Sequence, residues 1–555
     1  MSNVLRSVFV GFICCGAALA APILRLSNAA VGPLFIAAGQ NGPTQTITAA
    51  NAGDGALTLS ASANASWLSP SIVGSSVQIA LNTSSLTRNS YTGTVVVSAP
   101  GAVDAPQTIT VTVQIGSSVP DSMDLYLSAG SSATQTFISG STFNTSVTNP
   151  AGGPTLSVAS LGGGSFSFST SYQVKAQAPT GTGDGDYKGS FTVTGSTISG
   201  DNKTVPVTAH VTSQPIANPT AIRAFRIAQG AASQTQYVAL SNTGLGTLSA
   251  SGVTGAPSWL TASVQNNLVT LVASATGMSP GTYTSTISVA SNARNSPTSI
   301  PVELDVLTTG PAWTYYRGVL DNAIFGIGDA VAPGGIIALF GEQLTTGPVG
   351  GATKLPLGTS LGGATVFVNN QPAPIYYVSA GQIDFMIPYA TPAGPAMVRV
   401  DRDGQTGNSV SLGIVPTAPR ILPIGFGNYG IVVLSDLATF AIPPTPGYLS
   451  RPAKVGSDVI VIYALGLGQT SPPAVDGQAA LATQVNPLPT VVFGESLFVG
   501  SGVNATPQYA GLTPGLVGLY QINVLVPAGT PLGNAVPIYL NQNGVASNRV
   551  NIATQ

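Results

Sequence analysis

The chain has 555 residues, of which 44% are hydrophobic and only 6% are charged. Its 17 basic and 19 acidic residues nearly cancel, which excludes the basic surface that a nucleic-acid-binding protein needs. The 66 glycines and 42 prolines favour short strands and turns over long helices. At roughly 100–150 residues per domain, the length predicts about four or five domains in an all-β protein.

The N-terminus has the pattern of a secretory signal peptide over residues 1–20. Arg6 precedes an apolar run, and Ala18-Leu19-Ala20 forms a small-residue cleavage site. Two alternatives are a lipoprotein anchored at Cys14 or Cys15 and a retained N-terminal anchor helix. We expect a secreted or cell-surface protein whose mature chain has no cysteine, and therefore no disulfide. No later run of 18 apolar residues predicts a membrane span.

A repeat of about 96 residues organises the N-terminal half of the chain. Tyr91, Tyr187 and Tyr283 each lie in an alternating strand pattern, and their spacing is constant (187 − 91 = 283 − 187 = 96). Short alternating strands separated by turn residues are typical of β-sandwiches. We therefore predict three tandem sandwich modules at residues 21–116, 117–213 and 214–309.

The first and third of these modules also share a tryptophan motif. Ser66-Trp67-Leu68 returns as Ser258-Trp259-Leu260, each 24 residues before the repeated tyrosine. This motif, with the strand and tyrosine turn that follow, resembles the BACON family of Ig-like modules, which was named for a suspected carbohydrate-binding role. The middle module has Gly163 at the corresponding position. We therefore expect a degenerate Ig-like sandwich there, without the tryptophan function.

The C-terminal half contains a second repeat, carried by an alternating strand. Residues 382–387 read QIDFMI and residues 521–526 read QINVLV, and each run is followed by a proline. Alternation places the apolar residues of each run on one face, toward a sandwich core, and the proline ends the strand. Each run is followed by a glycine turn, another strand and a Ser/Asn pair, which predicts two related modules at residues 310–418 and 419–555.

These modules carry a recognisable set of sequence words, in order: APGGIIALFG, LGGATVFVNNQPAPIYYVSAGQIDFMIP, TAPRIL, GSDVIVIYALGLG and GLYQINVLVPAG. Residues 317–555 resemble the Solibacter-type C-terminal domain family of secreted acidobacterial proteins. The resemblance implies secretion and an Ig/TIG-like fold, and the family has no established activity. With the N-terminal modules, the expected architecture is a tandem array of Ig-like β-sandwiches.

Aromatic side chains are the binding candidates. An exposed indole or phenol ring can stack on a sugar face with little loss of conformational entropy. Along a strand, however, a tryptophan and the following leucine point to opposite faces, and burial of the larger side chain is the default expectation. The candidates, each weighed against a place in the core, are Trp67, Trp259, Tyr376, Tyr377 and Tyr520.

Catalytic and metal-binding signals are sparse, and we do not expect an enzyme. The single histidine, His210, lies in an alternating strand. Asp184-Gly185-Asp186 has the beginning of an oxygen-ligand loop, but Lys188 stands where a further ligand is needed, so a turn is favoured over calcium at Asp184 and Asp186. No other cofactor is expected. The carboxylates available to a glycosidase show no pairing in the sequence: Asp321, Asp329, Glu342 and Asp384.

The expected function is non-catalytic recognition or adhesion at the cell surface or in the extracellular matrix, with polysaccharide as the favoured ligand. The second hypothesis is a structural stalk or spacer whose C-terminal modules serve attachment or assembly. The third is a carbohydrate-active hydrolase, which would require a convergent acidic pair. Exposed side chains at Trp67 and Trp259 would favour the recognition hypothesis, and buried ones would favour the stalk.

Overall fold

A computed structural model describes residues 21–162, 170–347, 349–494 and 502–555. The predicted signal peptide and Gly163 lie outside these residues. Apart from one 3-10 turn, η1 (Ser199–Asp201), the regular structure of the described residues is β-strand. In this part of the chain, no helix has the length and hydrophobicity to cross a membrane.

Module one comprises two sheets with strand orders β1-β3-β6-β5 and β2-β8-β7-β4. Its strands are β1 (Leu24–Leu26), β2 (Ala30–Ile36), β3 (Gly42–Asn51), β4 (Ser60–Ala63), β5 (Leu68–Val73), β6 (Ser76–Leu81), β7 (Asn89–Ser98) and β8 (Gln107–Ile115). Buried and less buried residues alternate strictly along β8, as expected for a strand with one face on a core.

Module two comprises sheets β10-β13-β12 and β11-β14-β15-β9. Its strands are β9 (Met123–Leu127), β10 (Ser132–Ser139), β11 (Asn144–Thr148), β12 (Thr155–Ser160), β13 (Thr170–Gln177), β14 (Gly185–Thr194) and β15 (Thr204–Val211).

Module three comprises sheets β16-β18-β21-β20 and β17-β23-β22-β19. Its strands are β16 (Ala217–Pro219), β17 (Phe225–Ala228), β18 (Gln234–Asn242), β19 (Ala250–Thr254), β20 (Leu260–Gln265), β21 (Leu268–Ala273), β22 (Gly281–Ser291) and β23 (Thr298–Leu307).

The first three modules share one strand arrangement, except that the described strands of module two include no counterpart of β1 and β16. In each, an early strand pairs in parallel with the last strand: β2 with β8, β9 with β15, and β17 with β23. The repeated tyrosines also have one role. The hydroxyls of Tyr91, Tyr187 and Tyr283 each donate to the carbonyl four residues upstream, at 3.1, 2.9 and 3.0 Å. A tyrosine bonded back to the backbone in this way is a hallmark of immunoglobulin-like sandwiches.

Module four comprises sheets β24-β25-β31-β30-β26 and β27-β28-β32-β33, with β29 on β28. Its strands are β24 (Trp313–Asp321), β25 (Ile336–Glu342), β26 (Gly350–Gly351), β27 (Ser360–Leu361), β28 (Ala364–Val368), β29 (Gln371–Ala373), β30 (Ile375–Val378), β31 (Gln382–Met386), β32 (Gly394–Arg402) and β33 (Gln405–Ile414).

Module five comprises sheets β34-β36-β42-β41-β38-β37 and β40-β39-β43-β44, with β35 on β36 and β45 on β43. Its strands are β34 (Arg420–Ile421), β35 (Val432–Leu434), β36 (Val459–Leu465), β37 (Thr470–Ser471), β38 (Gln484–Val485), β39 (Thr490–Phe493), β40 (Val503–Ala505), β41 (Tyr509–Leu512), β42 (Tyr520–Leu525), β43 (Gly533–Gln542), β44 (Val545–Ala546) and β45 (Val550–Thr554).

The repeated sequence segments of these two modules form equivalent strands with equivalent partners. The strand that carries QIDFM, β31, pairs with β25, and its counterpart β42 pairs with β36. Gly334 and Gly456, which precede β25 and β36, have φ values of +75° and +76°, and each N–H donates 2.8 Å to the end of the partner strand. Only glycine adopts such a backbone conformation without strain.

The Ser/Asn pairs have equivalent roles as well. Asn408 bonds to both backbone polar groups of Thr314 at 2.7 and 3.0 Å, and Asn548 bonds to those of Ile421 at 2.7 and 2.9 Å. In each module the asparagine therefore ties the first strand to the rest of the sandwich.

Each module has its own hydrophobic core, but modules four and five are joined. Met386 and Tyr389 of module four belong to the core of module five. The Tyr389 N–H donates 2.8 Å to Asp476, and its carbonyl accepts a bond of 2.8 Å from Gln469. These contacts make the two C-terminal modules one packed unit.

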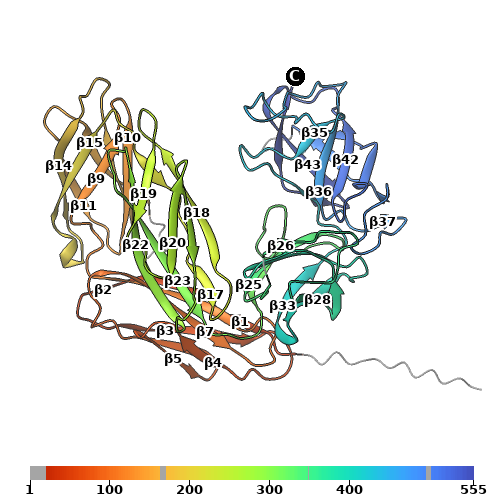
Figure 1. Ribbon diagram of the computed structural model, residues 1–555, viewed down its shortest axis with the longest axis horizontal. Helices are drawn as coiled ribbons and strands as arrows, with labels where there is room; N and C mark the ends of the chain where they lie inside the picture. The colour runs from red at the N-terminus through yellow and green to blue at the C-terminus, as the bar shows by residue number, and fades with distance from the viewer. Residues whose placement is uncertain (1–20, 163–169, 348, 495–501) are drawn as a thin grey trace, which may run out of the picture.

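The chain folds back on itself, so that module one contacts module four (Figure 1). Asp104, in the loop between β7 and β8, has a fully buried side chain. It accepts bonds from the Ser411 N–H at 2.6 Å and the Ser411 hydroxyl at 2.7 Å, on the edge strand β33. Its own N–H donates 2.8 Å to the Ser409 carbonyl, and Arg25 neutralises its carboxylate. We call this contact the Asp104 clasp.

Modules two and three rise from module one on one side, and modules four and five rise on the other (Figure 1). A second contact joins the two sides near the base. Arg226 of β17 bonds to Glu342 of β25, with 2.8 Å from Nε to Oε1, and Tyr315 donates 2.9 Å to the same carboxylate. A simple extended string of modules, which the sequence order suggests, is therefore not what the structure shows.

Candidate functional site

The two repeated tryptophans lie inside the sandwich cores. The exposed fractions of Trp67 and Trp259 are only 7% and 9%. A Cβ on Gly93 would lie 3.2 Å from the Trp67 ring, so this glycine lets the strand pass close to the indole. The expectation of core positions is met, and the alternative of exposed sugar platforms at Trp67 and Trp259 is wrong, because a buried indole offers no free face.

The predicted tyrosine candidates have mainly structural contacts. Tyr520 is fully buried, and its hydroxyl donates to the Gly468 carbonyl. The prediction that Tyr520 contacts a ligand is therefore also wrong. Tyr376 is half-buried, and its hydroxyl donates across the module junction to the Val517 carbonyl. Burial raises the pKa of both phenols above the ordinary value. Tyr377 is half-buried in β30.

The two aspartates weighed for calcium have other partners. Asp184 accepts bonds from the Ser213 N–H at 3.0 Å and the Ser213 hydroxyl at 2.7 Å. Asp186 binds His210 and the guanidinium of Arg294, at 2.7 Å each. Within the described residues, no group of three or more His, Cys, Asp or Glu side chains could hold a metal ion. The interpretation of this segment as a structural turn and strand start fits these contacts better than calcium.

His210 instead forms a charged junction between modules two and three. Its Nδ1 lies 2.7 Å from Asp186, its Nε2 lies 2.9 Å from Asp124, and Tyr126 stacks on the ring at 4.4 Å. Asp186 continues the network to Arg294 of module three. A neutral imidazole has one N–H donor, so only the imidazolium can donate to both carboxylates.

The ionised Asp186 carboxylate is expected to stabilise this junction through its contacts with His210 and Arg294. The hydrogen bond from His210 and the charge of Arg294 lower the pKa of Asp186, so this carboxylate loses its contribution only as the pH falls below the usual aspartate range. Thermal unfolding at about pH 5 and about pH 2.5, on either side of the usual aspartate pKa of roughly 3.9, tests this by comparing the wild-type chain with Asp186→Asn, which should lose less stability at the lower pH. Equal pH dependence in both proteins would contradict the prediction.

The carboxylates considered for glycoside hydrolysis each have a structural partner. Asp321 accepts backbone bonds from Ala323 and Ile324 at 3.0 and 2.8 Å, and Asp329 pairs with Arg420 at 3.1 Å. Glu342 binds Arg226, as described above. Asp384 accepts 2.8 Å from Gln382, and burial raises its pKa. These bonds explain the positions of the four groups without a catalytic role.

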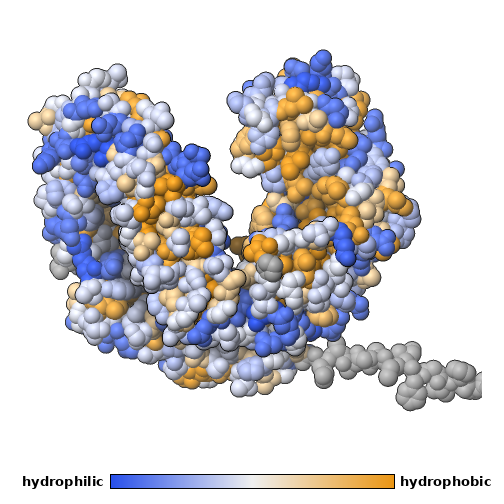
Figure 2. Space-filling view, viewed as in Figure 1, coloured by the Kyte–Doolittle hydropathy of each residue, from blue (hydrophilic) through white to orange (hydrophobic). Residues whose placement is uncertain are grey.

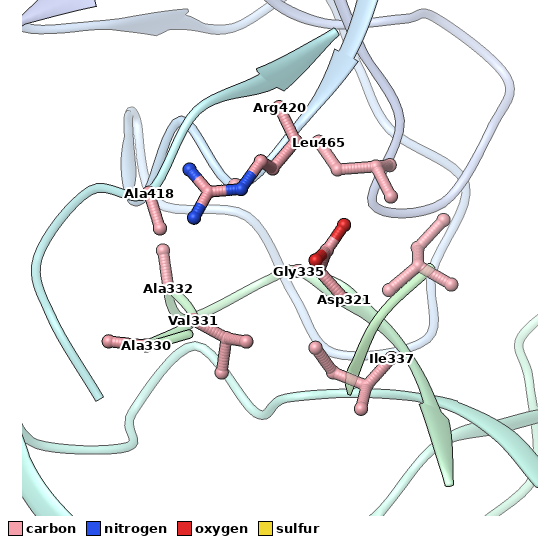
Figure 3. Close-up of a pocket in the computed structure, with 11 residues that line it drawn as sticks. Asp321, Ala330, Val331, Ala332, Gly335, Ile337, Ala418, Arg420 and Leu465 are labelled. Atoms are coloured by element: carbon pink, nitrogen blue, oxygen red, sulfur yellow. The ribbon is translucent and has the colours of Figure 1, made fainter. Parts of the chain in front are cut away.

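A cavity at the junction of modules four and five is too small for a substrate (Figure 3). Its volume of about 10 Å³ is that of roughly one water molecule. Asp321 and Arg420 contribute its polar lining, among alanine, valine and isoleucine side chains. The buried Nε of Arg420 has no hydrogen-bond partner in the protein, so this cavity can place a water but not a ligand.

A larger groove of about 440 Å³ crosses module three beside β23. Arg223 and Glu303 lie in it with the hydroxyls of Thr284 and Thr286. The volume is in the range of ligand sites, but its lining contains no aromatic ring that could stack on a sugar.

The structure does contain an exposed group of aromatic rings, in module five. We define the aromatic cluster as Phe426, Tyr429, Phe440 and Tyr448. Phe426 and Tyr448, which are 37% and 40% exposed, have ring centres 5.3 Å apart. Tyr429 lies 6.1 Å from Phe426, and Phe440 lies 5.6 Å from Tyr448. Such centroid spacings are those of favourable aromatic pairs.

Backbone hydrogen bonds hold the cluster in place. Phe440 and Tyr448 lie in the long connection between β35 and β36, where the Phe440 N–H donates 2.8 Å to Leu449 and the Tyr448 N–H donates 3.1 Å to Thr445. The Tyr429 hydroxyl donates 2.9 Å to the Asn534 carbonyl. The loops that carry the rings are therefore held by hydrogen bonds within the protein.

The surroundings of the cluster are apolar. Leu437 and Leu449, which flank it in sequence, are 61% and 65% exposed. Figure 2 shows a hollow between the two sides of the molecule, with hydrophobic side chains gathered over the flank formed by the C-terminal modules. Large exposed apolar patches on soluble proteins often mark interaction sites.

The sequence analysis did not identify the cluster. The sequence feature that could have revealed the cluster is a pair of segments rich in aromatic residues, glycine and proline, at residues 425–430 and 440–449. These segments interrupt the strand pattern of module five. The antiparallel bridges Pro423–Gly430 and Val433–Phe440 each close a turn beside one of these segments, and the segments meet where the rings of Phe426 and Tyr448 pack together.

The fold and this surface define a chain of tandem Ig-like β-sandwiches with an exposed aromatic cluster. No protein-family model matches the sequence, and no curated protein matches it. Among solved structures, the chain is similar to Sidekick-1 immunoglobulin domains 1–5, with 12% identity over 96% of this chain and 98% of that chain, and a TM-score of 0.16.

A structure described as the basis of Dscam isoform specificity matches with 10% identity over 71% of this chain and 99% of that chain, with a TM-score of 0.22. The endo-fucoidan hydrolase MfFcnA4 of glycoside hydrolase family 107 matches with 13% identity over 52% of this chain, with a TM-score of 0.18. The match spans 45% of that hydrolase. At these identities and scores, the likenesses carry no conclusion about what this chain does.

Proposed function

We propose that the chain is a secreted, non-catalytic recognition or adhesion protein, and that it binds polysaccharide through the aromatic cluster of module five. The observation that carries this proposal is the exposure of Phe426 and Tyr448 on loops fixed by backbone hydrogen bonds. A ring held in place stacks on a sugar face at a low entropic cost, so binding keeps most of the contact energy.

The resemblance to BACON modules supports polysaccharide as the ligand, and the resemblance to the Solibacter-type C-terminal family supports secretion. The tryptophans that carry the BACON resemblance are buried, so the proposed binding surface lies in the C-terminal half instead. The alternative of a stalk requires an extended string, which the Asp104 clasp opposes. The hydrolase alternative has no support from its candidate carboxylates, which have structural partners.

The test is co-sedimentation and affinity electrophoresis of the chain with a panel of polysaccharides. Two stacked rings contribute about 0.5–1.5 kcal/mol each, so Phe426→Ala combined with Tyr448→Ala is expected to weaken binding by roughly ten- to a hundredfold. Tyr237→Ala is the matched control, because this tyrosine of β18 is 60% exposed and lies outside the cluster.

Circular dichroism and thermal unfolding must show that the double variant is folded. Equal binding by the double variant and the wild-type chain would contradict the role of the cluster. Binding lost only in the Tyr237→Ala variant would place the site on module three.

A further inference from the structure

The rings of the aromatic cluster do not form a flat surface. The planes of Phe426 and Tyr448 are inclined at 58°, those of Phe426 and Tyr429 at 61°, and those of Phe440 and Tyr448 at 90°. A row of sugar rings on the face of a crystal is coplanar and needs coplanar partners. Phe426 and Tyr448, with ring centres 5.3 Å apart, pack against each other at an angle, so the cluster offers single ring faces and edges and no common plane for a row of sugars.

An acidic side chain in the loop that carries Phe440 and Tyr448 already has hydrogen-bond partners within that loop. Asp436 accepts bonds from the N–H groups of Ala438 and Thr439 at 3.0 and 2.9 Å and from the Thr439 hydroxyl at 2.6 Å. These bonds lower the pKa of Asp436 to about 2. The group is therefore anionic at ordinary pH, and it disfavours an anionic ligand beside the cluster.

The two cationic side chains of the same loop balance its two carboxylates. Arg451 pairs with Asp458 at 2.6 Å. Lys454 is exposed, but the residues on either side of it are tied to the C-terminal strand, through bonds of 2.8 Å from Ala453 to Ala553 and 3.0 Å from Val455 to Gln555. Residues 435–458 thus contain two acidic and two basic side chains, with no excess of positive charge.

The polar groups left at the rings are suited to a neutral ligand. The Tyr448 side chain is exposed beside Leu449, with Pro446 two residues earlier also exposed. Apolar surface with a single hydroxyl on one ring matches a pyranose, which presents C–H groups on its faces and hydroxyls at its edge. A carboxylated or sulfated sugar would meet no excess of positive charge in this loop, so the cost of removing its hydration would be poorly compensated.

From these observations the geometry points to a neutral, soluble polysaccharide chain as the ligand of the aromatic cluster, and against charged chains or crystalline polymer surfaces. This inference rests on the proposed function and narrows its ligand class. It also predicts that binding depends little on salt, because the contact is made by stacking and not by ion pairs.

The test uses the full chain in native gels that contain barley β-glucan or glucomannan as neutral probes and alginate or polygalacturonate as anionic probes, together with sedimentation on crystalline cellulose and chitin. We expect retardation in at least one neutral gel, with less than a twofold change between low salt and about 1 M NaCl, where the Debye length is about 3 Å. Phe426→Ala with Tyr448→Ala abolishes the retardation, whereas Lys454→Ala does not.

Retardation only by the anionic probes, lost in high salt or in Lys454→Ala, would overturn the inference and leave polysaccharide recognition in place. Binding only to crystalline cellulose or chitin would likewise overturn the inference and leave polysaccharide recognition in place. Binding to none of the probes would overturn both the inference and the proposed function, provided that thermal unfolding shows a folded chain.

Discussion

Replacement of Trp259 by alanine is expected to lower the free energy of unfolding of module three by about 3–5 kcal/mol without changing polysaccharide affinity. The indole is part of the core that contains Leu271 and Ile287, and a buried aromatic side chain leaves a cavity that its neighbours fill only in part. The same replacement of Trp67 is expected to have a similar effect on module one, where Val95 and Ile109 line the core.

Differential scanning calorimetry measures this effect, because loss of stability in one module shifts one transition and leaves the others. Val73→Ala is a control in module one, since this side chain is 53% exposed. Variants at Trp67 and Trp259 that keep their stability but lose polysaccharide binding would contradict the core role. Such a result would show that the tryptophans contribute to binding.

Replacement of Asp104 by alanine is expected to open the contact between modules one and four. The carboxylate is fully buried and bonded to Ser411, while Arg25 remains 36% exposed, so solvent weakens the ion pair but not the two hydrogen bonds. Loss of hydrogen bonds to a buried charge costs about 3 kcal/mol, which shifts the equilibrium between closed and open forms by roughly a hundredfold.

Small-angle X-ray scattering measures the opening as a larger radius of gyration, while the unfolding transitions of the individual modules stay in place. Asp54→Ala is the matched control, because Asp54 is an exposed residue of the same module. Unchanged scattering by the Asp104→Ala variant would show that other contacts, such as Arg226 with Glu342, hold the modules together.

Local patterns predicted the sandwiches well. The 96-residue tyrosine spacing corresponds to three identical hydroxyl-to-backbone bonds, and the QIDFM and QINVL runs are the equivalent strands β31 and β42. These features depend on residues close together in the chain, where alternation and turn chemistry decide the structure. The hairpin turn at Asp403-Gly404, between β32 and β33, is another local feature, with positive φ values of 50° and 78° at its two residues.

Contacts between distant segments were not predictable in this way. The Asp104 clasp joins residues 307 positions apart, and nothing in the sequence near Asp104 distinguishes it from an aspartate in a surface turn. The aromatic cluster depends on two loops of module five meeting. Phe426 and Tyr448 were overlooked because they lie in segments without periodicity, whereas Trp67 and Trp259 drew notice because they repeat.

The most direct test of polysaccharide recognition by the aromatic cluster is isothermal titration with the polysaccharide that retards the chain most strongly. The wild-type chain, Tyr448→Phe and Tyr448→Ala are compared. Loss of one stacked ring costs about 0.5–1.5 kcal/mol, so Tyr448→Ala is expected to bind roughly two- to tenfold more weakly, while Tyr448→Phe keeps most of the affinity because it retains the ring. Equal affinity of Tyr448→Ala and the wild-type chain would contradict recognition by this surface.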